Sequence, residues 1–244
     1  MAFNEYLIKN PKLSILMPAY NEGATIAKIV EKIDKVDLAR IGVDRELIIV
    51  DDGSKDKTVE IVKHLQAKYP YIRFIQHPKN KGKGGAIKTA IKAATGNILI
   101  VQDADLEYDP RDYFRCIMPI LKGKVKVVYG SRRLEKKNKQ HSHFSFYLGG
   151  VGITWVFNIL FLTHLTDEPT CYKTFRADVI KRIKINGNKF DWEPEVTAKV
   201  VKKGIKIYEV PIRYYPRTEK QGKKIKWKDG IDAILTMLKY RFVD

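Results

Sequence analysis

Cysteine is scarce in this chain, and the few thiols are far apart. Cys116 and Cys171 are the only two cysteines among 244 residues, and neither lies in a CxxC pair or in a cluster of histidines. This scarcity argues against a disulfide-stabilised secreted scaffold and against a structural zinc site. No secretory leader is recognisable in MAFNEYLIKNPKL, so we expect a reducing, cytoplasmic location and two small, buried thiols.

Acidic residues are also few in comparison with basic ones. The 28 Asp and Glu residues face 46 Lys and Arg residues, which leaves a formal net charge of +18. Such an excess indicates an anionic partner. A nucleic acid, an acidic membrane surface or a phosphorylated substrate would each satisfy it.

The sequence contains no internal repeat and no low-complexity linker. Hydrophobic residues make up 44% of it, which is enough for one core, so we expect a single domain over residues 1–244. Short apolar runs typical of strands occur at 13–17, 46–50, 72–75, 98–102 and 125–129. Between them, apolar side chains recur with helical spacing at 26–36, 59–65 and 87–94. This alternation predicts an α/β fold in which a mostly parallel sheet is flanked by helices.

Each of the first four predicted strands is followed by a polar loop. In chain order these loops are PAYNEG (18–23), DDGSKDKT (51–58), NKGKGG (80–85) and DADLE (103–107). The carboxyl ends of parallel strands meet at one edge of a sheet, where the N-termini of the following helices also gather. The sequence therefore predicts one binding site built from all four loops.

The fourth loop is acidic in an otherwise basic chain. Asp103 and Asp105 are two residues apart in an extended segment, so they point to the same side, and Glu107 adds a third carboxylate. Hard cations such as Mg²⁺ or Mn²⁺ prefer a few carboxylates completed by substrate phosphates. The alternative is a solvated acidic turn, but clustered like charges beside a buried strand are costly without a cation. Asp109 precedes Pro110 and is interpreted as a helix cap.

The second and third loops contain candidate nucleotide-binding groups. Asp51 and Asp52 end a strand, where a carboxylate can accept from a ribose or a base, although turn formation is an equal alternative. Ser54 or Asp56 is expected to cap the next helix. The NKGKGG loop, which contains Lys83, is a candidate diphosphate cradle at a helix start. It matches neither GxGxxG nor GxxxxGKS/T, which argues against a dinucleotide-dependent oxidoreductase.

Residues 144–162 form a charge-free apolar segment of borderline transmembrane length. A single crossing would separate the polar loops before it from the basic residues after it, so we expect an amphipathic helix at a membrane interface. The basic run RRLEKKNK, residues 132–139, would favour anionic head groups beside it, and 132–166 is the expected membrane and acceptor segment. A helix buried in the core or in a dimer interface is the alternative.

Seven motifs give the chain a family resemblance. They are SILMPAYNEGATI, IIVDDGSKDKT, NKGKGGAI, VQDADLEYDP, YGSRR, TCYKTFR and EVPIRY, within residues 12–228. In this order they resemble the inverting family-2 glycosyltransferases of the dolichol-phosphate mannose synthase type, including dolichyl-phosphate glucosyltransferases. The resemblance implies a GT-A (Rossmann-like) fold, a nucleotide-diphosphate-sugar donor of the UDP-glucose or GDP-mannose type, Mg²⁺ or Mn²⁺, and a polyprenyl (dolichyl) phosphate acceptor. We expect such a protein to act peripherally, at the cytosolic face of a membrane.

The resemblance also assigns residues to the donor and the metal. The implied metal ligands are Asp103, Asp105 and Glu107. The implied nucleotide-sugar site comprises Pro18, Tyr20, Glu22, Asp51, Asp52, Asp103, Arg217 and Lys224, and the third loop adds Lys83. Arg217 and Lys224 belong to a basic C-terminal loop and helix, residues 213–244.

For the acceptor, the resemblance assigns Arg132 to the phosphate and makes Arg132 and Asp105 central to catalysis. A second basic residue is usual in the acceptor loop of the family, but Gln140 stands at that place in this sequence. Lys139, His141 or His143 would then substitute for it.

Chemistry distinguishes the possible acceptors. A phosphate acceptor needs little base catalysis, because a monoester with a second pKa of about 6 is mostly dianionic at pH 7. A saccharide hydroxyl is the runner-up and would need a carboxylate base, for which Asp167, Glu193 or Glu195 are candidates. Glu193 and Glu195 also suit a helix N-terminus. A polyanion-binding protein would explain the positive net charge but not the acidic loop. No nucleic-acid-binding motif accompanies the basic runs, so no nucleic-acid partner is expected.

Overall fold

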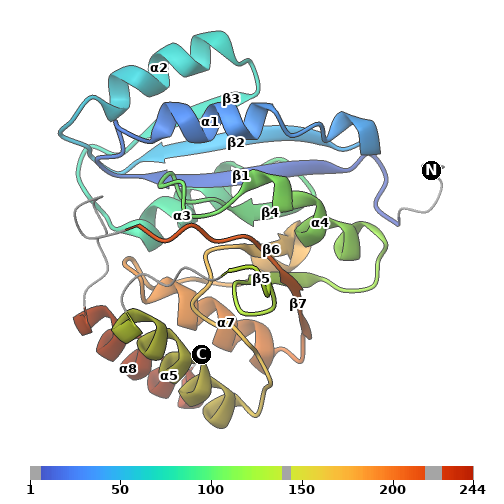
Figure 1. Cartoon of the computed structure of the whole chain (residues 1–244), viewed down its shortest axis with the longest axis vertical. Coiled ribbons are helices and arrows are strands. Elements are labelled where there is room, and N and C mark those ends of the chain that lie inside the picture. Colours follow the sequence, from blue (N-terminus) through green and yellow to red (C-terminus); the bar gives the residue numbers. More distant parts are fainter. Residues whose placement is uncertain (1–6, 139–143, 218–226, 244) are drawn as a thin grey trace.

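A seven-stranded sheet forms the centre of the molecule in the computed structural model, which describes residues 7–138, 144–217 and 227–243 (Figure 1). The strands are β1 (Lys12–Ala19), β2 (Asp44–Asp51), β3 (Ile72–Gln76), β4 (Ile98–Val101), β5 (Val127–Ser131), β6 (Lys173–Arg176) and β7 (Ile207–Pro211). Their order across the sheet is β3-β2-β1-β4-β6-β5-β7. β6 runs antiparallel to β4 and β5, whereas the other paired strands are parallel. The predicted mostly parallel α/β sheet is confirmed.

Helices flank this sheet and extend beyond one end of it (Figure 1). They are α1 (Ile26–Asp34), α2 (Thr58–Lys68), α3 (Lys83–Ala93), α4 (Tyr113–Leu121), α5 (Phe144–Phe161), α6 (Ala177–Ile180), α7 (Trp192–Lys202) and α8 (Trp227–Phe242), with the 3₁₀ turns η2 (Ala39–Ile41) and η3 (Pro110–Asp112). α3 packs on β1 and β2, and α4 packs on β5 and β6. The predicted helical faces are buried: Ile29 of α1 and Ile87 of α3, for example, are completely enclosed. Cys116 and Cys171 are buried, free thiols, as predicted.

The sheet differs from the prediction in its second half. β5 begins two residues later than the predicted run at 125–129, because Val125 is only half-buried while Gly130 and Ser131 are enclosed and pair with β7. β6 and β7 were not predicted as strands. β6 is four residues long and includes Lys173, a charged residue that is nevertheless fully buried, so its apolar content gives little signal.

Three helices at the end of the molecule farthest from α2 form a second, smaller core (Figure 1). α8 packs on α5 and α7, and Phe157, Ala198 and Met237 are buried where the three helices meet. The predicted helix near 144–162 is therefore present. The alternative of a helix buried in the core is wrong, since Trp155 is 65% exposed, whereas a dimer interface stays a prediction. Among the described helices, none combines the length and apolar character that a membrane crossing requires.

Glu46 stabilises the edge of the sheet at which the parallel strands begin. Its Oε1 accepts hydrogen bonds from Ser14 Oγ at 2.6 Å, Thr95 N at 2.6 Å, Thr95 Oγ1 at 2.9 Å and Gly96 N at 3.1 Å. Burial alone would raise the pKa of Glu46, but the hydrogen bonds from Ser14 and Thr95 lower it below its ordinary value of 4.5. One buried carboxylate thus ties β1, β2 and the turn before β4 together.

Replacing Glu46 with alanine is expected to lower the free energy of unfolding by about 2–4 kcal/mol, because several buried donors lose their acceptor. Urea denaturation at pH 7 measures this loss, with the exposed Glu31→Ala as the matched control. Since the folded-state pKa lies below the unfolded value, the charge of Glu46 stabilises the fold above pH 4.5 and ceases to do so as pH falls through the folded pKa. The difference in free energy of unfolding between wild type and Glu46→Gln should therefore become smaller only in acid. Equal free energies of unfolding for Glu46→Ala and wild type at pH 7 would contradict the stabilising role of Glu46.

Candidate active site

Hydrogen bonds join the first three polar loops at the carboxyl edge of the sheet. The backbone N–H of Asn21 donates to Ser54 Oγ at 2.9 Å, which links the first loop to the second. The backbone N–H of Lys81 donates to Asp52 Oδ1 at 2.9 Å, which links the second loop to the third. Ser54 therefore bridges loops and does not cap a helix, whereas Asp56 accepts from Thr58 N at 3.0 Å at the start of α2. The predicted convergence of these loops is confirmed.

Asp51 and Asp52 end β2 and have different surroundings. Both oxygens of Asp52 accept backbone or ring donors, including Gly82 N at 2.7 Å and His77 Nδ1 at 2.7 Å. Asp51 Oδ2 accepts from Gly53 N at 3.2 Å, as a turn residue does. Asp51 Oδ1 is buried and has no hydrogen-bond partner among the described residues. Asp52 is thus committed to holding the third loop, and Asp51 is the carboxylate with an acceptor position left.

The third loop does not offer its backbone as a diphosphate cradle, which corrects that part of the prediction. The N–H groups that open α3 are already donated, Gly84 N to Lys189 O at 3.2 Å and Gly85 N to Asn188 O at 3.0 Å. Gly82 has φ +85°, and a Cβ there would lie 2.3 Å from Asn188 O. Gly82 and Gly84 are therefore required by close packing against 187–189, a segment far away in the sequence.

Lys83, in the same loop, connects the acidic loop with α7. Its Nζ lies 2.9 Å from Asp103 Oδ2 and 2.9 Å from Glu193 Oε1. Burial would lower the pKa of Lys83, but the charges of Asp103 and Glu193 raise it well above its usual value, so the ammonium stays charged. Glu193 occupies the first turn of α7, as predicted, and also reaches the site.

Arg217 neutralises the other side of the acidic loop. Its Nη2 lies 2.8 Å from Asp105 Oδ2, its backbone N–H donates to Glu107 Oε1 at 2.8 Å, and its Nη1 is 3.6 Å from Glu22 Oε2. Two of the predicted donor-site residues, Glu22 and Arg217, thus meet the predicted metal ligands. Asp109 accepts from Arg111 N at 3.0 Å and caps η3, as predicted.

The three carboxylates of the acidic loop face two cations, Lys83 on one side and Arg217 on the other. Asp103 pairs with Lys83 and Asp105 with Arg217, and no group of three or more His, Cys, Asp or Glu side chains in the described part of the chain is disposed to hold a metal ion. The three-ligand arrangement of Asp103, Asp105 and Glu107 is therefore not formed in this conformation. Metal binding by these residues stays a prediction.

The electrostatics of the loop nevertheless suit a hard cation. Burial, and then the charges of Asp103 and Glu107, raise the pKa of Asp105 to about 7 in spite of Arg217. One arginine does not fully compensate this group of carboxylates. An all-oxygen donor set with excess negative charge fits Mg²⁺ or Mn²⁺.

Arg132 lies at the end of β5 and is fixed by Asp167. Its Nη2 is 2.6 Å from Asp167 Oδ1 and its Nε is 2.7 Å from Asp167 Oδ2, a two-point pairing of guanidinium and carboxylate. The guanidinium carbon also lies 5.1 Å from the ring centre of Tyr214, whose hydroxyl donates to Glu107 Oε2 at 3.2 Å. The acceptor arginine of the prediction is thus one side chain away from the acidic loop.

Gln102 and Tyr214 are site residues that sequence reasoning missed. Gln102 is completely buried; its Oε1 accepts from the hydroxyls of Tyr113 at 2.7 Å and Tyr172 at 2.6 Å, and its Nε2 donates to Asp103 O at 2.9 Å. It therefore fixes the backbone from which the acidic loop starts. The available signal for Gln102 was a polar residue at the end of the apolar run ILIVQ, and that for Tyr214 was its place at the end of the EVPIRY motif.

The remaining predicted residues are placed as follows. Pro18 ends up half-buried within β1, and Tyr20 is half-buried in the loop that follows. Lys139, His143 and Lys224 lie outside the described residues, as do Gln140 and His141.

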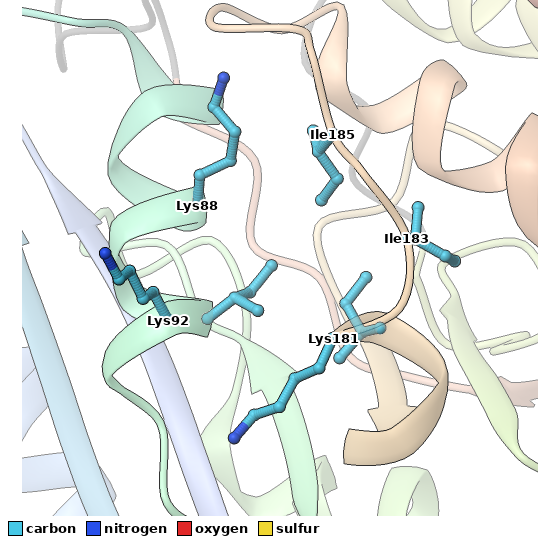
Figure 2. A pocket seen from close by; sticks show the side chains of 7 residues that line it. Lys88, Lys92, Lys181, Ile183 and Ile185 are labelled. Atoms are coloured by element: carbon cyan, nitrogen blue, oxygen red, sulfur yellow. The ribbon is translucent and has the colours of Figure 1, made fainter. Parts of the chain in front are cut away.

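A surface hollow of about 350 Å³ lies between α3 and the segment that follows β6 (Figure 2). Isoleucines line it together with Lys88, Lys92 and Lys181, whose side chains point in different directions (Figure 2). Lys88 Nζ donates to Asn186 O at 3.1 Å, and Lys181 Nζ donates to Ala94 O at 2.7 Å. None of the lining residues belongs to the four polar loops, so the hollow is separate from the site at the carboxyl edge.

Comparison with known proteins gives this arrangement a context. Residues 14–183 match the model of glycosyl transferase family 2. A dolichol-phosphate mannosyltransferase of Pyrococcus furiosus is 29% identical over 241 residues, covering 92% of this chain and 66% of that protein. A dolichyl-phosphate beta-glucosyltransferase of Trichomonas vaginalis is 28% identical over 238 residues, covering 93% of this chain and 72% of that protein.

The same fold occurs in a solved structure. Glucosyl-3-phosphoglycerate synthase from Mycobacterium tuberculosis, crystallised with Mn²⁺, UDP and glucosyl-3-phosphoglycerate, superposes with a TM-score of 0.71 at 19% identity. The match covers 96% of this chain and 81% of that chain. The predicted GT-A fold, a mostly parallel sheet flanked by helices, is confirmed.

Proposed function

The chain belongs to glycosyl transferase family 2, and on this basis we propose that it moves a hexose from a nucleotide-diphosphate sugar to a polyprenyl (dolichyl) phosphate at a membrane surface. The observation that carries the proposal is the meeting, at one sheet edge, of an acidic loop with Lys83 and Arg217 and, through Tyr214, with Arg132. Relatives named as a dolichol-phosphate mannosyltransferase and a dolichyl-phosphate beta-glucosyltransferase support the choice of acceptor. Membership of an enzyme family leaves a purely polyanion-binding role without support.

The donor is proposed to bind over the first, second and fourth loops. Asp51, with one oxygen unpartnered among the described residues, is suited to accept from the ribose or base. Asp103, Asp105 and Glu107 would hold Mg²⁺ or Mn²⁺, which when bound supplies charge stabilisation to the diphosphate. Pro18, Tyr20 and Glu22 in the first loop are proposed to flank the nucleoside, and Lys224 to join Arg217 at the diphosphate.

The reaction proposed is a single displacement. An acceptor phosphate oxygen forms a bond to the anomeric carbon, and the bond from that carbon to the donor diphosphate breaks, so the nucleoside diphosphate leaves with the electron pair. Because the attacking phosphate is already anionic at pH 7, the protein needs to align the reactants and stabilise the departing charge. Lys83 and Arg217, which pair with the acidic loop, are the described cations proposed to stabilise the charge of the departing diphosphate.

The candidate bases for a saccharide hydroxyl acceptor are all engaged, which favours a phosphate acceptor. Asp167 pairs with Arg132 at 2.6 Å, Glu193 with Lys83 at 2.9 Å and Glu195 with Lys199 at 2.6 Å. Burial would raise the pKa of Asp167, but the charge and hydrogen bonds of Arg132 lower it overall, which makes it a weak base. A phosphate acceptor brings its own nucleophile and requires none of them.

An exposed apolar patch supports the membrane surface. α5 and the residue after it expose Trp155, Ile159 and Leu162, and the adjacent α8 exposes Trp227 and Phe242. Exposed large apolar side chains on two adjacent helices are typical of an interaction surface. The net charge of +18 would favour the anionic cytosolic leaflet, so we propose that the patch rests on that face.

Transfer of labelled sugar tests the proposal. The purified protein is offered UDP-glucose, UDP-N-acetylglucosamine or GDP-mannose with a short polyprenyl phosphate and Mn²⁺, and label is measured in the lipid phase. One donor is expected to label the lipid, and excess EDTA is expected to stop the transfer. Absence of lipid label with all three donors, or full transfer in EDTA, would count against the acceptor and the metal respectively.

A further inference from the structure

Glu195 is a buried carboxylate of α7 that the proposed reaction does not use. Its Oε1 accepts from Asn186 N at 2.8 Å, and its Oε2 accepts from Gly187 N at 2.6 Å. Lys199 Nζ, one turn further along α7, lies 2.6 Å from Oε1. The side chain is completely enclosed. Both carboxylate oxygens therefore hold the start of one segment, residues 186–189, which we call the junction segment.

Hydrogen bonds keep this carboxylate ionised. Burial would raise the pKa of Glu195, but hydrogen bonds from Lys199 and from the backbone N–H groups of Asn186 and Gly187 lower it below its ordinary value of 4.5. Lys199 Nζ also donates to Lys184 O at 2.6 Å, just before the junction segment. Because hydrogen bonds to a charged acceptor are stronger than those to a neutral one, this ion pair fixes the segment firmly to α7.

The other end of the junction segment holds the first turn of α3, which begins at Lys83. The carbonyl of Asn188 accepts from Gly85 N at 3.0 Å. The carbonyl of Lys189 accepts from Gly84 N at 3.2 Å. These bonds take the place of a side-chain cap, which this helix lacks. A shift of the junction segment would therefore move the turn that carries Lys83.

The position of Lys83 matters because its ammonium joins two carboxylates. Its Nζ lies 2.9 Å from Asp103 and 2.9 Å from Glu193, which also belongs to α7. The helix α7 thus holds Lys83 in two ways, at its tip through Glu193 and at its backbone through Glu195. A charged group stabilises a departing anion only where it is already in place, so both contacts bear on the reaction.

We propose that Glu195 is a positioning residue for sugar transfer, which acts by holding the junction segment and, through it, the backbone of Lys83. This inference rests on the proposed function, in which Lys83 stabilises the departing diphosphate. It differs from the role of a base for a hydroxyl acceptor, since the carboxylate takes up no proton. Loss of its charge displaces Lys83 without removing a group that contacts the donor.

A double-mutant cycle tests the route through Lys83. Glu195→Gln is expected to lower kcat about 10- to 100-fold, because a misplacement of about 1 Å at a reacting site costs up to about 100-fold. In a protein that already carries Lys83→Gln, the same change is expected to lower kcat less than about twofold further, since the group that it positions is gone. The KM for the acceptor should stay within about twofold of the starting value in both backgrounds.

Glu46→Gln is the matched control, because Glu46 is also a buried acceptor of backbone N–H groups, at the opposite edge of the sheet. It should lower the unfolding temperature and leave kcat unchanged, which separates loss of stability from loss of positioning. Gly187→Ala displaces the junction segment by another route, since its Cβ would lie 2.9 Å from Glu195 Oε2 while the carboxylate keeps its charge. It should lower kcat in the wild type and not in Lys83→Gln.

Thermal unfolding reports whether each variant is folded at the assay temperature, and if Glu195→Gln is not, Gly187→Ala decides by the same comparison. Equal losses of kcat in the two backgrounds would overturn the route through Lys83, as would a wild-type kcat in the folded variants. Either result leaves the proposed transfer intact. If the wild type transfers no sugar from any donor, the proposed function itself fails and the role of Glu195 fails with it.

Discussion

Replacing Asp105 with asparagine is expected to lower the rate of sugar transfer by about 1000-fold, because one of the carboxylates proposed to hold the divalent cation would be lost. Asparagine has nearly the same shape, so packing in the acidic loop is preserved. Asp105 is buried, and burial, together with the charges of Asp103 and Glu107, raises its pKa. Removing its charge relieves this repulsion but also removes the pairing with Arg217, so we expect little net change in thermal stability.

The control for this variant is Asp178→Asn, which removes one carboxylate of an exposed pair with Arg176. It should retain full transfer activity. The measurements are initial rates over a range of Mn²⁺ concentrations, together with a thermal unfolding curve. Wild-type rates in Asp105→Asn at every Mn²⁺ concentration would contradict the assignment of Asp105 to the metal.

Arg217→Gln is expected to lower transfer by about 100- to 1000-fold, the loss associated with one stabilising group at a developing charge. The guanidinium lies close to the carboxylates of Asp105, Glu107 and Glu22. If Asp105 and Glu107 held a divalent cation, the guanidinium would be available to the leaving diphosphate. The same variant should also lose thermal stability in EDTA, because the buried carboxylates lose their counterion.

Two readouts make this prediction specific. Mn²⁺ should raise the unfolding temperature of Arg217→Gln more than that of the wild type, since the cation replaces the missing charge. For Arg217→Lys, which keeps a positive charge, the increase in unfolding temperature caused by Mn²⁺ should lie between those of the wild type and Arg217→Gln. If Arg217→Gln loses activity but responds to EDTA and Mn²⁺ as the wild type does, Arg217 does not neutralise the acidic loop.

The convergence of the four polar loops followed from the sequence, because parallel strands direct every following loop to one edge. Asp103 and Asp105 were found for the same reason, since they directly follow a short, completely buried strand. β6 was not predicted from the sequence because Lys173 and Arg176 occupy two of its four positions. A buried lysine does not contribute to the apolar pattern from which strands are predicted.

Contacts between distant segments were beyond prediction from local pattern. Lys83 and Glu193 are 110 positions apart, and the use of the α3 N–H groups by 188–189 depends on how that segment folds back. The sequence therefore suggested a backbone cradle for phosphate where the structure has a packed junction. The pairing of Arg132 with Asp167, which are 35 positions apart, is of the same kind.

The most direct test of the account compares acceptors in a single assay. The wild-type protein, Mn²⁺ and the donor sugar that gives transfer are incubated with a polyprenyl phosphate, the matching polyprenol that lacks the phosphate, or a simple saccharide. Label is expected on the polyprenyl phosphate alone, because Asp167, Glu193 and Glu195, the candidate bases for a hydroxyl acceptor, are each paired with a cation. Equal or faster transfer to the polyprenol or the saccharide would contradict a phosphate acceptor.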